Sequence, residues 1–276
     1  GVGLALGGDP AWAKYRQVGA VWALTPFVGG GIAYGIASVL PREDVPEHLS
    51  VPLLAGAVGA VLANVHFAFL GPAGTAGSLT EAVQRVLGTD SLAVPVLVSL
   101  ALGGAVAVLV SLQIRRDEAT GLRRVLLALG SLVAFSAGGS QVGLAVGPLV
   151  PLLEDVGIVS TFGVLVAGGL GILVGSWTGA PRMIKSLSQD YSSLGPRRSI
   201  AALVPSFLIA QVAVLLGVPV SFNEVVVSAI IGSGAAVGGR GAVDARKIGF
   251  TVGAWVVSFG VAFLLAYGVV VLTPMG

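Results

Sequence analysis

The residues of this sequence best able to do chemistry are a few polar side chains set inside long apolar stretches. Of the 13 aspartate and glutamate residues, only Glu224 lies within such a stretch, and no lysine or arginine does. Glu224 ends the segment Pro219-Val-Ser-Phe-Asn-Glu224, in which Ser221 and Asn223 are also polar. Polar and ionisable groups inside a membrane are costly and usually mark a binding site or an ion pathway. We therefore predict that Ser221 and Asn223 bind a ligand.

Two roles fit Glu224. A turn between two apolar arms leaves free backbone N–H groups at the start of the second arm, and these groups suit an anion. A carboxylate beside an anion would repel it unless a proton or a cation neutralises the carboxylate, which makes Glu224 a candidate coupling residue. The alternative is a glutamate in the first helical turn that caps the second arm. Both roles can hold together.

A second polar pair, Ser140 and Gln141, lies at the centre of the apolar stretch 125–153. Glycines flank the pair in Ala137-Gly-Gly-Ser-Gln-Val-Gly143, and they predict a helix that is broken near the middle of a membrane. Interrupted segments of this kind point to the binding site of a transporter. We predict that Ser140 and Gln141 contact the ligand; hydrogen bonding between helices is the alternative. His66 and Gln211 fit a packing role better.

The composition indicates a helical membrane protein. Hydrophobic residues make up 55% of the 276 residues and charged residues 10%, whereas soluble domains carry about 25% charged residues. The apolar runs are continuous and about 20 residues long, as a membrane-spanning helix requires, and they do not alternate as the strands of a β-barrel do.

The stretch 200–238 is split by Gly217 to Ser221 into arms too short for two independent spans, and it predicts a re-entrant hairpin. Full spans are predicted at 17–40, 51–70, 91–113, 156–178 and 248–272.

The basic residues fix a predicted orientation. Most of the 15 lysines and arginines fall in three short segments, 114–124, 179–199 and 240–247. Cytoplasmic loops carry an excess of lysine and arginine, so we place these three segments inside the cell. Counting crossings back along the chain places 41–50 inside as well, and both 1–16 and 71–90 outside. The prediction is a multi-pass protein of the cell membrane, with a short interfacial helix within 74–90.

A repeat within the chain predicts inverted symmetry. Gly1-Val-Gly-Leu-Ala-Leu-Gly-Gly8 and Gly232-Ser-Gly-Ala-Ala-Val-Gly-Gly239 share the pattern GxGxAxGG. A tryptophan follows each copy, and a tyrosine follows each tryptophan at the same spacing. An odd number of predicted crossings separates the copies, so they face opposite sides, as in many secondary transporters. We assign 1–113 to the tail of the first repeat with linking helices, and 114–276 to the second. We expect that the sequence begins part-way through a longer protein.

The sequence carries no signature of an enzyme. We find no zinc-protease, nucleophile-elbow or Walker A motif, and GxGxAxGG does not follow a strand as a dinucleotide fingerprint does. The chain has no cysteine and only two histidines, His48 and His66. We therefore expect neither catalytic residues nor a bound metal, and no cofactor apart from a sodium ion or proton as coupling ion.

Three segments resemble the inorganic phosphate transporter (PiT) family. Phe135-Ser-Ala-Gly-Gly-Ser-Gln-Val-Gly-Leu-Ala-Val-Gly-Pro148 is similar to the family's FxHGANDVANAxGP motif. Pro196-Arg-Arg-Ser-Ile-Ala-Ala202, followed by Leu216-Gly-Val-Pro-Val-Ser221, is similar to the segment that leads into the family's PVSTTH hairpin. Trp22-Ala-Leu-Thr-Pro26 is close to the W-x-x-S-P of the helices that follow the hairpins. The resemblance implies an inverted-repeat transporter whose polar motif residues are associated with phosphate and a driving cation.

The sequence also departs from the family's pattern. The Asn-Asp pair of the first motif falls on Ser140 and Gln141, and its second Asn falls on Leu144. The Thr-Thr-His of the hairpin falls on Phe222, Asn223 and Glu224. Losing the aspartate removes a cation ligand that the family pattern supplies, and Glu224 returns a carboxylate from the hairpin.

These inferences combine into one prediction, an all-α polytopic membrane protein with an inverted repeat, a broken helix and a re-entrant hairpin. Its predicted function is secondary active transport of inorganic phosphate, or of a related anion such as sulfate, coupled to a sodium or proton gradient. The residues predicted to hold the anion are Ser140, Gln141, Ser221 and Asn223, and Glu224 would take the coupling ion. The expected partners are the oxyanion and the lipid bilayer, with a homo-oligomer left open and no nucleic acid. The alternative, favoured by apolar Leu144 and Phe222, is a non-transporting membrane scaffold or sensor that retains the fold.

Overall fold

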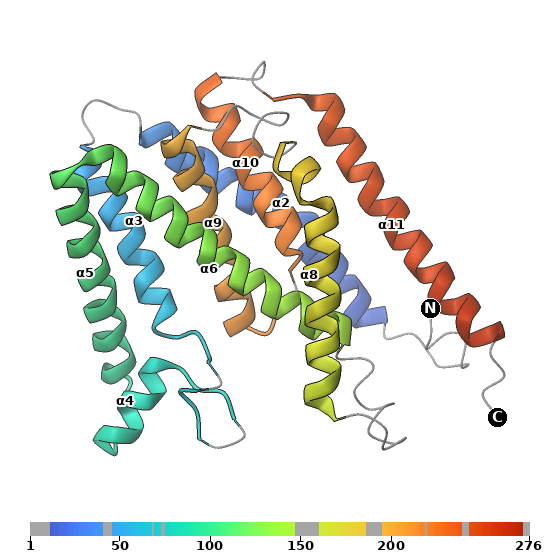
Figure 1. Cartoon of the computed structure of the whole chain (residues 1–276), viewed down its shortest axis with the longest axis horizontal. Helices are drawn as coiled ribbons and strands as arrows, with labels where there is room; N and C mark the ends of the chain where they lie inside the picture. Colours follow the sequence, from blue (N-terminus) through green and yellow to red (C-terminus); the bar gives the residue numbers. More distant parts are fainter. Residues whose placement is uncertain are drawn as a thin grey trace.

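The chain folds into a set of long, tilted helices that lie side by side (Figure 1). The computed structural model describes residues 12–40, 46–67, 69–72, 75–146, 160–185, 195–218, 220–238 and 243–272. Within these residues the secondary structure is helical, apart from one isolated bridge between Phe67 and Gly77. The helices are α2 (Trp12–Val39), α3 (Glu47–Leu62), α4 (Leu79–Leu87), α5 (Ala93–Arg116), α6 (Glu118–Val146), α8 (Thr161–Lys185), α9 (Pro196–Leu215), α10 (Phe222–Gly238) and α11 (Ala245–Leu272). The predicted all-α membrane fold is confirmed.

Five of the described helices are long and apolar enough to cross a membrane. They are segments of α2, α5, α6, α9 and α11. The predicted span 51–70 is too long, because α3 ends at Leu62. The chain turns there because Asn64 donates a hydrogen bond to the Ser99 hydroxyl of α5 at 2.8 Å, and Thr80 donates one to Asn64 Oδ1 at 3.3 Å. Asn64 therefore has a structural role.

The helix break predicted at 137–143 is wrong. Helix α6 runs without interruption from Glu118 to Val146, through the glycines and the polar pair Ser140 and Gln141. Glycine inside a helix costs roughly 0.5–1 kcal/mol relative to alanine. An unwound segment in an apolar surrounding would leave backbone N–H and C=O groups unsatisfied at several kcal/mol each, which is the larger cost. Residues 147–159, which follow α6, lie outside the described part of the chain.

The predicted hairpin at 200–238 is present. Helix α9 ends in a turn at Gly217, whose φ of 64° is in the left-handed region that glycine adopts without strain. The N–H of Val218 donates to the Ala213 carbonyl at 2.8 Å and the N–H of Gly217 to the Val214 carbonyl at 3.1 Å, which is a Schellman motif. Helix α10 then returns to the end where α9 began (Figure 1). Since α9 alone is long enough to cross a membrane, the re-entrant course stays a prediction.

The described parts of the three basic segments 114–124, 179–199 and 240–247 lie at one end of the molecule (Figure 1). The α5–α6 turn and the start of α9, α11 and α3 lie at the upper end in Figure 1, whereas α2 begins and α4 lies towards the lower end. Both α2 and α11 have 28 residues, and Trp22 and Trp255 occupy the same position within them. Equal length and register support a repeat; its inverted symmetry stays a prediction, as do the domain boundaries.

Candidate functional site

The hairpin tip places Ser221 and Glu224 at the start of α10. The Ser221 hydroxyl accepts a hydrogen bond from the Glu224 N–H at 3.4 Å, and the Ser221 carbonyl accepts one from Val225 at 3.1 Å. Ser221 is therefore an N-cap, which satisfies one of the free N–H groups at a helix start. The spacing of Ser221 and Glu224 matches a capping box, but the Glu224 Oε2 atom has no hydrogen-bond partner among the described residues.

One oxygen of the Glu224 carboxylate has no hydrogen-bond partner among the described residues. The side chain is half-buried, and its Oε2 atom is buried and meets no hydrogen-bond donor in the described part of the chain. A buried carboxylate oxygen without a donor is costly unless a proton or a cation neutralises it. The other predicted tip ligand, Asn223, is exposed, and Phe222 beside it is 9% exposed. The tip thus directs Glu224 inward and Asn223 to the surface.

The first arm of the hairpin is joined to α6 beside the predicted polar pair. Gln211, which is 6% exposed, donates a hydrogen bond from Nε2 to the Ser136 hydroxyl of α6. Ser136 lies one helical turn before Ser140, so Ser136 and Ser140 share a face of α6. The side chains of Ser140 and Gln141 themselves lie outside the described residues. The structure therefore brings the α6 motif backbone next to the hairpin, and it does not test the contacts predicted for Ser140 and Gln141.

The second arm of the hairpin packs on α2 through residues without bulky side chains. A Cβ atom on Gly29 would lie 2.7 Å from the Ser228 hydroxyl and 3.3 Å from the Val225 carbonyl oxygen, and Gly30 faces Ser228 in the same way. Small residues allow such close approach between membrane helices. One turn earlier on α2 is Thr25, which is 5% exposed and donates to the Val21 carbonyl at 2.7 Å. The first turns of α10 are thus held against α2 by close backbone packing.

His66 belongs to a structural cluster at the other end of the α3–α5 pair. Its Nε2 atom lies 3.0 Å from the Glu81 carboxylate. Glu81 closes a capping box with Ser78 at the start of α4, and the hydrogen bond from the Ser78 N–H, followed by its interactions with His66 and Arg85, lowers the pKa of Glu81. The cluster confirms the short helix predicted within 74–90 and explains His66 without a ligand.

The comparison with known proteins decides the family. A model described as "Phosphate transporter family" matches residues 1–266. The chain belongs to the phosphate transporter family. A protein of Thermococcus kodakarensis named as a putative phosphate permease is 26% identical over 283 residues, covering 92% of this chain and 64% of that protein. Sodium-dependent phosphate transporter 1-A of Xenopus laevis is 29% identical over 146 residues, covering 50% of this chain and 21% of that protein. The chain therefore spans less than two thirds of these relatives.

The fold of this phosphate transporter family member has a solved counterpart. A structure titled "The sodium-dependent phosphate transporter" matches with a TM-score of 0.64 and 18% sequence identity, covering 94% of this chain and 64% of that one. At this identity the likeness concerns the fold alone. The family assignment and the membrane character of the sequence prediction are confirmed by these matches.

Sequence reasoning missed one polar contact of the site. Ser136 lies within the motif segment that carried the resemblance, yet only Ser140 and Gln141 were predicted to bind, because glycines flank them. The signal that points to Ser136 is its spacing of one helical turn from Ser140. Gln211 has the packing role that the sequence predicted. Its side chain donates a hydrogen bond to the Ser136 hydroxyl of α6.

Proposed function

We propose that the protein transports inorganic phosphate by secondary active transport, with the sodium gradient as the driving force. The proposal rests on membership of the phosphate transporter family and on the names of relatives such as sodium-dependent phosphate transporter 2 of Xenopus tropicalis. The observation that carries it within this chain is the buried Glu224 Oε2 atom, which meets no donor among the described residues. A sodium ion prefers oxygen ligands, and it would supply the positive charge that this oxygen lacks.

In this proposal the hairpin tip and α6 together form the transport site. Ser221, Asn223, Ser140 and Gln141 would hold the phosphate, while Glu224 would hold the sodium ion or, as the second candidate, a proton. A cation on Glu224 removes the repulsion between the carboxylate and the anion, so that each would bind more tightly when the other is present. This mutual dependence is what couples the two movements, because coupling between two sites is reciprocal.

Uptake by proteoliposomes tests the proposal. The protein should accumulate labelled phosphate when an inward sodium gradient is imposed, and not when potassium replaces sodium. Uptake under a proton gradient without sodium tests the proton as the coupling ion. Inhibition of phosphate uptake by excess unlabelled sulfate measures the selectivity between the two oxyanions. Gln141→Leu should weaken phosphate affinity, and Ser140→Ala should do so less, since hydrogen bonds to charged groups contribute about 1.5–3 kcal/mol. Absence of both uptake and phosphate binding by folded protein would favour the scaffold alternative that Phe222 suggests.

A further inference from the structure

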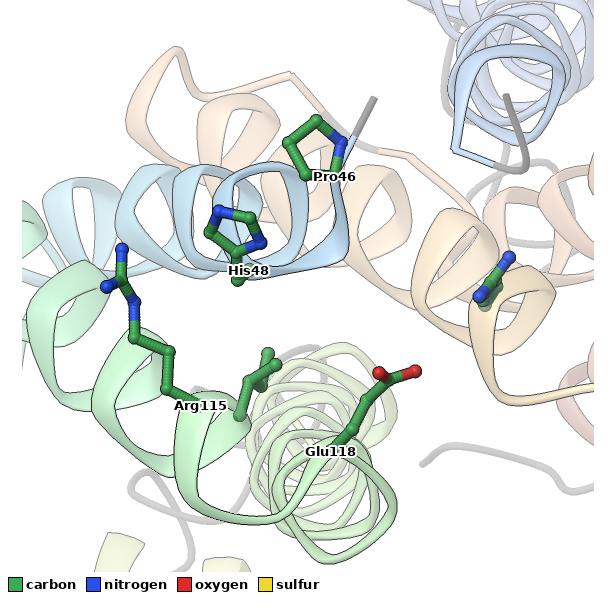
Figure 2. A pocket seen from close by; sticks show the side chains of 6 residues that line it. Pro46, His48, Arg115 and Glu118 are labelled. Carbon is green, nitrogen blue, oxygen red and sulfur yellow. The ribbon is translucent and has the colours of Figure 1, made fainter. Parts of the chain in front are cut away.

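A basic pocket opens at the end of the helix bundle remote from the hairpin tip. Its volume is about 480 Å³, and it lies between the starts of α3, α6 and α9 and the end of α5. The lining residues are Pro46, His48, Ile114, Arg115, Glu118 and Arg197 (Figure 2). Arg197 is the second residue of α9 and Gly217 follows its C-cap, so the pocket and the tip are separated by the length of a 20-residue helix, roughly 30 Å. The pocket is therefore distinct from the proposed transport site.

The residues beneath this pocket are closely packed. Ile114 is 5% exposed and belongs to the buried cluster that joins the same four helices, with Val51, Val58, Leu122, Val125, Leu129, Ile200, Val204 and Phe207. The Ser111 hydroxyl of α5 donates to the His48 carbonyl of α3 at 3.4 Å. At the α5–α6 turn, the Thr120 N–H donates to the Asp117 carboxylate at 3.2 Å, and a Cβ atom on Gly121 would lie 2.9 Å from Ile114 Cα. Arg115, Arg197 and His48 are thus attached to helices that pack closely against one another.

The charges around the opening favour a phosphate group. Figure 2 shows Arg115 and Glu118 on opposite sides of the opening, with His48 above it. Among the lining residues that the structure describes, Arg115 and Arg197 carry guanidinium groups, and Glu118 carries a carboxylate. This described part of the lining thus offers two guanidinium groups to an anion. Arginine is well suited to phosphate, because its planar fork of N–H donors matches the phosphate oxygens.

An apolar groove continues from the pocket along α6. The groove, about 580 Å³, shares Glu118 with the pocket and is otherwise lined by Ala119, Leu122, Arg123, Leu126, Leu127 and Pro196. The α6 residues recur at helical spacing, so they form one face. This face runs into the segment Glu118–Gly139, which is apolar and long enough to cross a membrane. The pocket therefore lies where the helix enters the hydrocarbon, with the groove below it. A free phosphate ion would gain nothing from such a groove.

We propose that this pocket and groove bind one anionic glycerophospholipid, with its phosphate between Arg115 and Arg197 and an acyl chain along Leu122, Leu126 and Leu127. Basic pockets between membrane helices on the cytoplasmic side bind anionic lipid head groups, and the basic loops place this end of the molecule in the cytoplasm. The proposal does not depend on phosphate transport, because its site lies at the opposite end of α9.

Lipid titration of the purified protein tests the proposal. Dioleoyl phosphatidylglycerol is added to the protein in detergent, and bound lipid is counted by native mass spectrometry. Dioleoyl phosphatidylcholine, which has the same chains and no net charge, should bind more weakly. Arg115→Ala and Arg197→Ala should each weaken phosphatidylglycerol about fivefold, and the double variant about 25-fold, since each arginine near a membrane surface contributes about that factor. If the double variant does not fold, Arg115→Gln alone gives the same single-site comparison.

Matched variants distinguish binding in this pocket from attraction to the basic surface as a whole. Arg124, exposed on the same helix, lines neither the pocket nor the groove, so Arg124→Ala should change binding by less than about twofold, well under the fivefold expected for a pocket arginine. An effect equal to that of Arg115→Ala would show a general surface charge and overturn the proposal. Leu127→Gln should weaken the lipid, whereas Leu109→Gln on the exposed side of α5 should not. If Leu127→Gln has no effect while millimolar inorganic phosphate displaces the lipid fully, the pocket binds free phosphate and the proposal is wrong.

Discussion

Gly232 of α10 lies in direct contact with the carbonyl group of Gly30 in α2. A Cβ atom at position 232 would overlap the Gly30 carbonyl oxygen, and its next neighbour, the Gly30 carbonyl carbon, would lie 2.7 Å away. The three nearest atoms all belong to the Gly30 backbone, so no flexible side chain can move aside. This contact fixes how far the second arm of the hairpin can approach α2, and it assigns a packing function to the first glycine of the repeated GxGxAxGG segment.

Gly232→Ala should therefore separate α10 from α2. Forcing a methyl group into a packed contact costs typically about 1–3 kcal/mol, so the protein should lose thermal stability and transport activity together. Gly31→Ala is the matched control, because a Cβ atom at Gly31 meets nothing within 4 Å. Thermal unfolding in detergent, followed by the loss of monodisperse protein, measures both variants. Equal stability of the Gly232 and Gly31 variants would contradict the close packing.

The sequence predicted the elements better than their interruptions. Apolar run length and glycine at position 217 were enough to predict long helices and the hairpin turn, because both depend on local chain chemistry. Glycines at 138 and 139 are equally suggestive in the sequence, but there the helix continues. A glycine ends a helix only where the backbone N–H and C=O groups that lose their helical hydrogen bonds find other partners. Those partners belong to neighbouring elements, which the local sequence does not show. The pairing of Gln211 with Ser136, 75 residues apart in the chain, is likewise decided by packing.

The hydrogen bond between Gln211 and Ser136 should couple the hairpin to α6. Gln211→Leu, Ser136→Ala and the double variant form a double-mutant cycle on unfolding free energy. We expect a coupling of roughly 0.5–1.5 kcal/mol, since side-chain hydrogen bonds between membrane helices average about 0.6 kcal/mol. Ser206, which is buried and bonds within its own helix α9, provides the control pair with Ser136. Additive effects for Gln211 and Ser136 would show that the two side chains do not depend on each other.

The inverted repeat predicts opposite exposure for the starts of α2 and α11. The chain has no cysteine, so Lys14→Cys and Lys247→Cys each create a unique thiol. In sealed vesicles, a reagent that cannot cross the membrane should label only one of the two variants, and permeabilisation should expose the other. A cysteine at position 185, at the end of α8, should label like position 247. Labelling of positions 14 and 247 from the same side would contradict the inverted repeat.

Glu224 provides the test of coupling. Glu224→Gln removes the negative charge while it keeps the side-chain shape and the Ser221 cap on the backbone N–H. If Glu224 carries the coupling ion, phosphate accumulation against its gradient should be lost, because the neutral amide no longer needs sodium or a proton as partner. Exchange of labelled for unlabelled phosphate requires binding but no gradient, and it should fall only about two- to tenfold, the equivalent of one hydrogen bond. Leu216→Ala, an exposed position just before the turn that takes no part in the proposed site, controls for changes at the tip. Were Glu224 only a helix-capping residue, Glu224→Gln would keep the cap, because glutamine also fits this position, and the dependence on the gradient would be unchanged. The two outcomes are separated by measuring uptake at several sodium concentrations with and without a proton gradient.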